Sequence, residues 1–237
     1  MMRSNTTTGG VLRKTLTEQV YRTLKEEIIL QQTPELKMGA RINEVELAAR
    51  LGCSTTPLRE ALNMLRRDNL IVTNAFHYSE VVSFSRKDIH DLLSIREELE
   101  LSALRQALPN ITAEDIQNLK DIQVEYERVY RKSDFLETYV VNRKFHDYIL
   151  SRADNRILSN LLDGLSEQCA LLRSSSMVET RRTFSPCGVF PPVVEHGQIL
   201  TAIEDGDSEA ACQAMSRHIR RVHDDVCSYY DRTKFNV

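Results

Sequence analysis

The sequence predicts a mainly α-helical protein with two parts, an N-terminal winged helix-turn-helix and an all-α antiparallel helical bundle. Glycine and proline are few, 8 and 6 of 237 residues, so long helices are permitted. Apolar residues recur three and four positions apart over most of the chain, which is typical of amphipathic helices. We expect a disordered tail over residues 1–10, a first domain over 11–84 and a second over 85–237.

The first domain opens with a predicted helix over residues 15–31 and a loop over 33–41. Residues 43–70 then form two short apolar-faced helices separated at Gly52, which is the arrangement of a helix-turn-helix. Short β-branched runs around a polar turn in residues 70–84 predict a hairpin. Three helices followed by a hairpin is the order of a winged helix-turn-helix.

The second helix of this pair begins with small hydroxyl side chains, Ser54, Thr55 and Thr56, and carries Arg59 one turn later. Backbone N–H groups and short polar side chains at a helix N-terminus suit DNA phosphates, and arginine can pair with guanine. Two alternatives stay open. The pair could be an ordinary helical hairpin, and Arg59 could form only a surface ion pair with Glu44 or Glu60.

The second domain opens at Ser85, which has the Ser-x-x-acid spacing of a capping box, and Thr112 repeats that signal. Everything beyond Ser85 has helical periodicity, with an irregular loop expected over 177–192. The helices are expected at residues 88–107, 112–132, 134–152, 155–175, 193–205 and 207–230.

Net charge is −3, but residues 11–88 carry +2 and residues 89–237 carry −6. The mildly basic N-terminal part, which we call the head, could contact phosphate, whereas the acidic remainder is expected to have a different role. The five cysteines are scattered without C-x-x-C spacing, so we expect reduced thiols in a cytoplasmic protein. No apolar run approaches a membrane span.

The head resembles the winged helix-turn-helix of the GntR family of bacterial transcription regulators. The family pattern matches through Glu44, Leu47, Ala48, Leu51, Gly52, Ser54, Pro57, Arg59, Glu60, Ala61, Leu62 and Leu65. The remainder resembles the FCD effector domain of the FadR-like branch, marked by Arg96–Glu100, Phe145-His146, Glu195-His196 and the run from Gly206 to His218. This resemblance implies a homodimeric regulator, a repressor in our interpretation, that binds a double-stranded DNA operator and responds to a small carboxylate.

Within that resemblance, DNA contacts are expected from Ser54, Thr55, Thr56 and Arg59, with Arg41 and His77 touching the backbone. The hairpin tip departs from the pattern. Phe76, His77 and Tyr78 stand where many relatives have basic residues and a glycine.

Three histidines, His146, His196 and His218, fall on three different predicted helices, and Asn142 precedes the first by one helical turn. Spacing alone favours three unconnected histidines. The resemblance instead implies that these positions bind a divalent metal. The family's fourth ligand is usually aspartate, so Asn142 brings no charge and should weaken binding. Three imidazoles with an amide oxygen suit Zn²⁺ or Ni²⁺ better than Ca²⁺ or Mg²⁺.

Arg96 and Arg173 are candidates to bind the carboxylate of an effector. The alternative for Arg96 is an intrahelical ion pair with Glu100. No catalytic motif is present, and we expect no enzyme activity. The rival hypotheses are a metal-dependent enzyme with an accessory helix-turn-helix, and a DNA-binding scaffold that ignores ligands.

Overall fold

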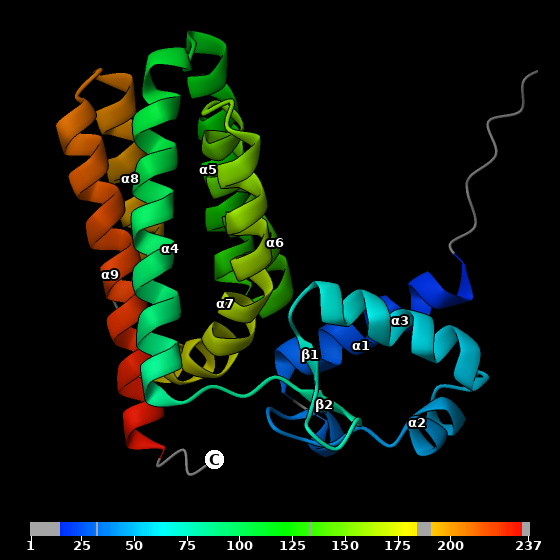
Figure 1. The fold of residues 1–237 in the computed structure, drawn as a ribbon. Coiled ribbons are helices and arrows are strands. Elements are labelled where there is room, and N and C mark those ends of the chain that lie inside the picture. The colour runs from blue at the N-terminus through cyan, green and yellow to red at the C-terminus, as the bar shows by residue number, and fades with distance from the viewer. Residues whose placement is uncertain (1–14, 32, 133, 184–190, 234–237) are drawn as a thin grey trace, which may run out of the picture.

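The computed structural model describes residues 15–31, 33–132, 134–183 and 191–233. The winged head packs beside the lower end of a tall helical bundle (Figure 1). The tail over residues 1–10 and Cys187, both subjects of the sequence predictions, lie outside the described residues. None of the helices that are described combines the length and the apolar character needed to cross a bilayer.

The head is a winged helix-turn-helix, as predicted. It contains α1 (Leu16–Leu30), α2 (Glu44–Arg50), α3 (Thr55–Arg67) and the antiparallel strands β1 (Ile71–Thr73) and β2 (Ser79–Val81). Thr15 and Glu18 form a capping box at the start of α1. Gly52 takes a φ of +64° between α2 and α3, a conformation that side chains with a Cβ rarely adopt.

The bundle is built from six helices among the residues described. They are α4 (Arg86–Ala107), α5 (Ala113–Arg131), α6 (Phe135–Ser151), α7 (Arg156–Thr183), α8 (Pro191–Glu204) and α9 (Ser208–Arg232). Both predicted capping boxes form, because Ser85 and Thr112 each exchange hydrogen bonds with the aspartate three residues later. The longest helices, including α4 and α9, run along the length of the bundle (Figure 1).

The prediction of an irregular loop over residues 177–192 is wrong at both ends. Helix α7 continues to Thr183, and α8 already begins at Pro191. The stretch from Met177 to Thr183 contains no glycine or proline, and most of its residues are good helix formers. Proline is well tolerated in the first turn of a helix, which explains the early start of α8. Residues 184–190 lie outside the described part.

The head packs against helix α7 of the bundle. The Asn69 side-chain amide, just beyond α3, donates to the Gly164 carbonyl at 3.1 Å, and Gln168 donates back to the Asn69 carbonyl at 3.3 Å. Lys25 of α1 forms an ion pair with Glu167 of α7 at 3.0 Å. The contact between the two domains is therefore made by direct hydrogen bonds and an ion pair, as well as by the connecting chain.

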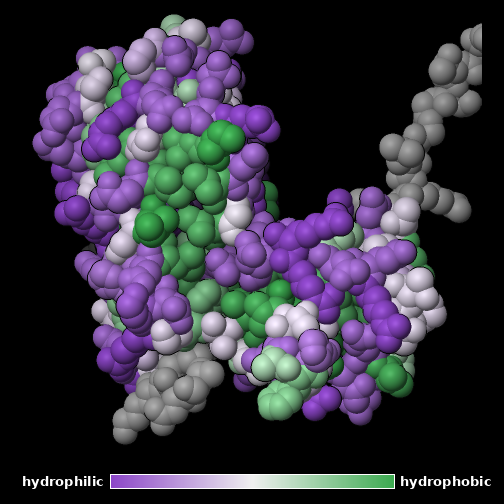
Figure 2. Space-filling view, viewed as in Figure 1, coloured by the Kyte–Doolittle hydropathy of each residue, from purple (hydrophilic) through white to green (hydrophobic). Residues whose placement is uncertain are grey.

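One face of the bundle is apolar although it meets solvent. Ile157 and Leu161 of α7 are 62% and 53% exposed, and Ile95 of α4 is 55% exposed. Ile157 and Leu161 are four residues apart, so they share one side of the helix. Figure 2 shows apolar side chains gathered along the bundle face beside α4. We call Ile95, Ile157 and Leu161 the apolar strip.

Candidate functional site

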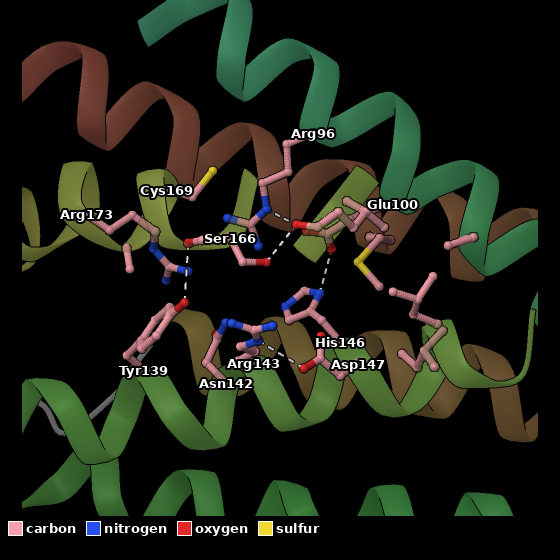
Figure 3. Close-up of a pocket in the computed structure, with 16 residues that line it drawn as sticks. Arg96, Glu100, Tyr139, Asn142, Arg143, His146, Asp147, Ser166, Cys169 and Arg173 are labelled. Atoms are coloured by element: carbon pink, nitrogen blue, oxygen red, sulfur yellow. Dashed lines mark hydrogen bonds and ion pairs between the residues drawn. The ribbon is translucent and has the colours of Figure 1, made fainter. Parts of the chain in front are cut away.

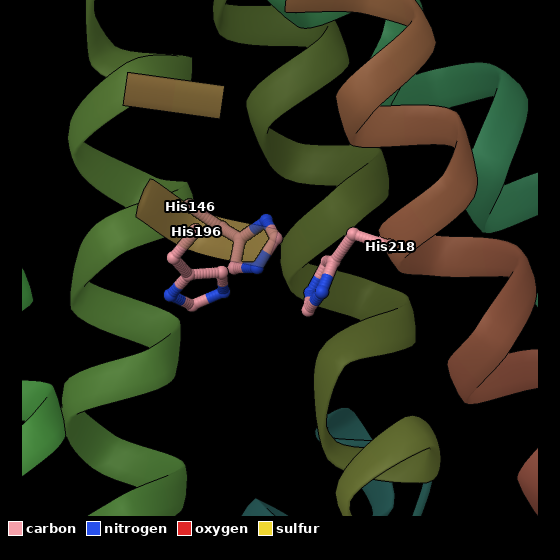
Figure 4. Close-up of side chains that lie close together, drawn as sticks. All are labelled: His146, His196 and His218. Atoms are coloured by element: carbon pink, nitrogen blue, oxygen red, sulfur yellow. The ribbon is translucent and has the colours of Figure 1, made fainter. Parts of the chain in front are cut away.

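The three predicted histidines meet inside the bundle, each from a different helix (Figure 4). His146 comes from α6, His196 from α8 and His218 from α9, and one nitrogen of each lies within 4.8 Å of the others. Their ring centroids are 4.7 to 5.4 Å apart. Three imidazole nitrogens gathered in this way could hold one divalent cation between them.

The chemistry of the cluster fits a cation. His196 is 0% exposed, and it stacks against Phe145 with centroids 4.3 Å apart. Neither of its ring nitrogens has a hydrogen-bond partner within the described part of the chain, and the same holds for Nε2 of His146 and Oδ1 of Asn142. Buried polar atoms normally have a partner, since leaving one unpaired costs about 1–3 kcal/mol. A metal would provide the missing partner.

Two carboxylates orient the outer imidazoles. Glu195 Oε2 lies 2.8 Å from His218 Nδ1, and Glu100 Oε2 lies 2.6 Å from His146 Nδ1, the second contact without ideal hydrogen-bond angles. Such carboxylates are typical outer partners of metal-binding histidines, because they fix the tautomer that leaves Nε2 available. The sequence does not predict these roles. The partners of both pairs come from different helices, and spacing along the chain does not reveal such contacts.

Burial keeps two of the imidazoles neutral. It lowers the pKa of His196 and of His218 well below the usual value, and the neighbouring histidines add to the effect. A neutral imidazole is the form that binds a metal, so no proton has to be displaced near pH 7.

The same shifts predict a pH dependence of stability for the metal-free protein. The unfolded chain binds protons on these histidines below about pH 6.5, whereas the folded chain resists them. Stability is therefore fully present above about pH 6.5 and is lost as the pH falls below it, by up to about 1.4 kcal/mol per pH unit per histidine. Urea unfolding at about pH 7.5 and 5.5 measures this. A His196→Phe/His218→Leu variant should show a flatter profile, and an equally steep one would contradict the assignment.

A cavity adjoins the histidines on the side of α6 and α7 (Figure 3). Arg96, Arg173, Asn142 and His146 line it, together with Glu100, Tyr139, Arg143, Ser166 and Cys169. Arg96 Nε lies 2.5 Å from Glu100 Oε1, so the intrahelical pair named as the alternative is present, and both partners still face the cavity. Burial alone would raise the pKa of Glu100, but Arg96 and His146 outweigh it and hold that pKa well below its usual range.

Arg173 differs from Arg96 because its guanidinium has no counter-charge among the residues that the structure describes. Its side chain is 7% exposed, and no carboxylate of a described residue lies within 4 Å of it. Burial, aided by the positive charge of Arg96, lowers the pKa of Arg173. Buried charges are normally paired. The cavity is thus lined by three guanidiniums, and its two carboxylates are already paired, Glu100 with Arg96 and Asp147 with Arg143.

The candidate DNA contacts lie on the surface of the head. Ser54 is the residue before α3 and makes no capping hydrogen bond, and Thr55 and Thr56 form the first turn of the helix. Arg59 is exposed, and its Nε lies 2.7 Å from Glu44 Oε2. The ion pair considered as an alternative is therefore present in the free protein. Arg41 and His77 are exposed beside the hairpin.

Two protein-family models match the chain. Residues 16–75 match the family described as bacterial regulatory proteins, gntR family, and residues 91–221 match the FCD domain. The regulator McbR of Escherichia coli (strain K12) is 32% identical over 158 residues, which cover 67% of this chain and 70% of McbR. An uncharacterized HTH-type transcriptional regulator, YdhC of Bacillus subtilis (strain 168), is 27% identical over 84% of this chain and 86% of its own length.

The fold also agrees with a solved structure of E. coli McbR/YncC, with a TM-score of 0.70 and 24% identity over 93% of this chain and all of that one. These relatives carry the names of transcription regulators. That favours a regulator over the metal-dependent enzyme considered from the sequence.

Proposed function

Since this chain belongs to the GntR family of bacterial regulatory proteins and carries an FCD domain, we propose that it is a repressor whose operator affinity is set by a small carboxylic acid. In this proposal residues 11–84 bind the operator, through Ser54, Thr55, Thr56 and Arg59 with Arg41 and His77 beside them. Residues 85–237 hold the acid and form a homodimer.

The unpaired guanidinium of Arg173 carries the proposal. A buried positive charge beside neutral imidazoles attracts an anion, and the planar guanidinium suits a carboxylate with two parallel hydrogen bonds. His146, His196, His218 and Asn142 would hold Zn²⁺ or Ni²⁺, which would supply a cation to which a carboxylate oxygen can bind. Arg96, on the opposite helix, would orient the rest of the acid.

The homodimer explains the apolar strip. Ile95, Ile157 and Leu161 are each more than half exposed, and apolar side chains gathered on one face, as in Figure 2, usually mark a protein contact. A two-fold partner presenting the same strip would bury it. The dimer would also position its two α3 helices to enter successive major grooves, as helix-turn-helix dimers do.

The contacts of α7 offer a route from acid to operator. Cys169 and Arg173 of α7 face the cavity, and Gly164, Glu167 and Gln168 of the same helix hold the head. Arg143 joins the two, since it lines the cavity and lies 2.6 Å from Glu167 Oε1. An acid that shifts α7 or Arg143 would therefore change the contacts between α7 and the head, and with them the position of α3. We favour this route over the short linker that precedes α4.

The test uses zinc-loaded full-length protein and a duplex selected by it from a random pool. Propionate, succinate and citrate are titrated while operator affinity is followed by fluorescence anisotropy. We expect at least one acid to change the Kd by about 5- to 150-fold, the range of a typical allosteric coupling. Arg173→Met should remove the response, and it should raise the Tm of the free protein because a buried unpaired charge is lost.

The matched control is Arg128→Met, which removes a surface arginine that is 52% exposed. It should leave both the response and the Tm unchanged. An Arg173→Met protein that keeps the full response, or that is markedly less stable than the wild type, would contradict the role given to Arg173.

A further inference from the structure

The tip of the wing presents an unusual side chain to solvent. Phe76 lies between β1 and β2 and is 80% exposed, more than any other large apolar side chain in the described part of the chain. Burying a phenylalanine side chain is worth about 1.5–3 kcal/mol, and here that gain is not used within the protein. Phe76 is therefore available to a partner.

The backbone at the tip is held in place by Asn74. Its side-chain oxygen accepts hydrogen bonds from the N–H groups of Phe76 at 3.0 Å and Tyr78 at 3.3 Å. The backbone groups of Asn74 also bond to His77 and Tyr78, and His77 takes a φ of +61°. A turn with this many hydrogen bonds has little freedom left to lose when it binds.

The Phe76 ring belongs to a layered stack. It lies nearly parallel to the Tyr78 ring, at an interplanar angle of 9° with centroids 6.2 Å apart. The Arg41 guanidinium lies over Tyr78 at 3.9 Å. Arg41 brings a positive charge to the Tyr78 face of the stack, and the Glu80 carboxylate accepts a hydrogen bond from the Asn74 side-chain amide at 3.2 Å on the strand that follows. A rigid apolar edge next to a cation suits a polyanion that can also accept an aromatic ring.

The stack is also joined to the recognition helix. Arg66 of α3 donates from Nη2 to Ser79 Oγ at 2.5 Å, where β2 leaves the tip. The wing is therefore fixed to α3, and in the proposed function the DNA bound by α3 is also the partner of Phe76.

We propose that Phe76 is a wedge that enters the minor groove of the operator, partly unstacks one base-pair step and bends the duplex. The inference rests on the proposed DNA-binding function. Apolar side chains that enter between base steps kink DNA in this way, and pyrimidine–purine steps open most easily. Selected operators should therefore carry such a step at a fixed distance from each half-site. Arg41 then lies beside the backbone phosphates.

The experiment compares wild type, Phe76→Ala, Phe76→Leu and Val124→Ala on one selected duplex. Val124 is a matched control because it is 70% exposed on the bundle, away from the head. The duplex carries dyes at its ends to report bending and 2-aminopurine at the pyrimidine–purine step to report unstacking. Kd is measured over a range of salt concentrations.

For wild type and Val124→Ala we expect a bent duplex and increased 2-aminopurine fluorescence. Phe76→Ala should lose both signals and bind about tenfold more weakly, whereas Phe76→Leu keeps most of each. The salt dependence should be the same in all four proteins, because the wedge carries no charge.

A wild-type complex that leaves the duplex straight and stacked overturns the wedge. So does a Phe76→Ala complex that bends and unstacks DNA like the wild type. Failure of the wild type to select any duplex is a different result, since it refutes the DNA-binding function itself.

Discussion

Replacing Arg59 with alanine is expected to abolish specific operator binding and to leave the fold intact. A bidentate contact to guanine contributes about 1–3 kcal/mol of discrimination. The proposed homodimer would make the contact twice, so the expected loss is about 2–6 kcal/mol, or roughly 30- to 10⁴-fold in affinity. Anisotropy titrations at about 0.15 M salt, against a scrambled duplex, measure the difference. Specific affinity retained at that salt concentration would refute the recognition role.

The ion pair with Glu44 supplies the control. Arg59 is 68% exposed in this pair, so the pair contributes about 0–1 kcal/mol and exchanges readily for a contact with DNA. Glu44→Gln releases Arg59 and removes a negative charge from the proposed DNA surface. Operator affinity should therefore stay equal or increase. A large loss in Glu44→Gln would show that the pair itself, rather than a free arginine, is what the operator requires.

Removing two of the three imidazoles should remove the metal. We expect the wild-type protein to bind about one Zn²⁺ per chain and His146→Ala/His218→Ala to bind none, as measured by elemental analysis after dialysis against zinc. One imidazole with an uncharged amide cannot hold the ion tightly. At a free zinc concentration about 1,000 times the Kd, binding stabilises the wild type by about 4 kcal/mol, and the variant should lack this increase in Tm.

A second pair of histidines makes the matched control. His90 and His223 lie with ring centroids 4.9 Å apart at the bundle surface, away from the cluster. His90→Ala/His223→Ala should therefore keep the full zinc content. Asn142→Asp should bind zinc more tightly, because it restores a negative ligand. Equal zinc content in the wild type and in the His146→Ala/His218→Ala protein would show that the metal binds elsewhere.

Much of the fold was predictable because its signals are local. Capping residues at Ser85 and Thr112 and steady apolar periodicity placed α4, α5 and α6 within two residues of their observed ends. Gly52 marked the turn between α2 and α3 for the same reason. The prediction of a loop was wrong over residues 177–183, where no glycine or proline interrupts the helix.

The site was predictable only in part. The three histidines were selected through a family resemblance, because no spacing rule brings together residues 50 and 22 positions apart. The orienting role of Glu195 depends on the packing of α8 against α9, which the sequence does not reveal. The same limit applies to Arg173. Whether a carboxylate lies near it depends on how all the surrounding helices pack, and none of the described residues supplies one.

Helix α7 both lines the cavity and contacts the head, so in the proposed mechanism acid binding and operator binding are thermodynamically coupled. If a ligand changes the affinity for the operator through α7, then the operator must change the affinity for the ligand by the same factor. Each bound DNA site would then act as an effector of the sensor. The concentration of acid needed for release would differ from one promoter to the next according to how tightly each holds the protein.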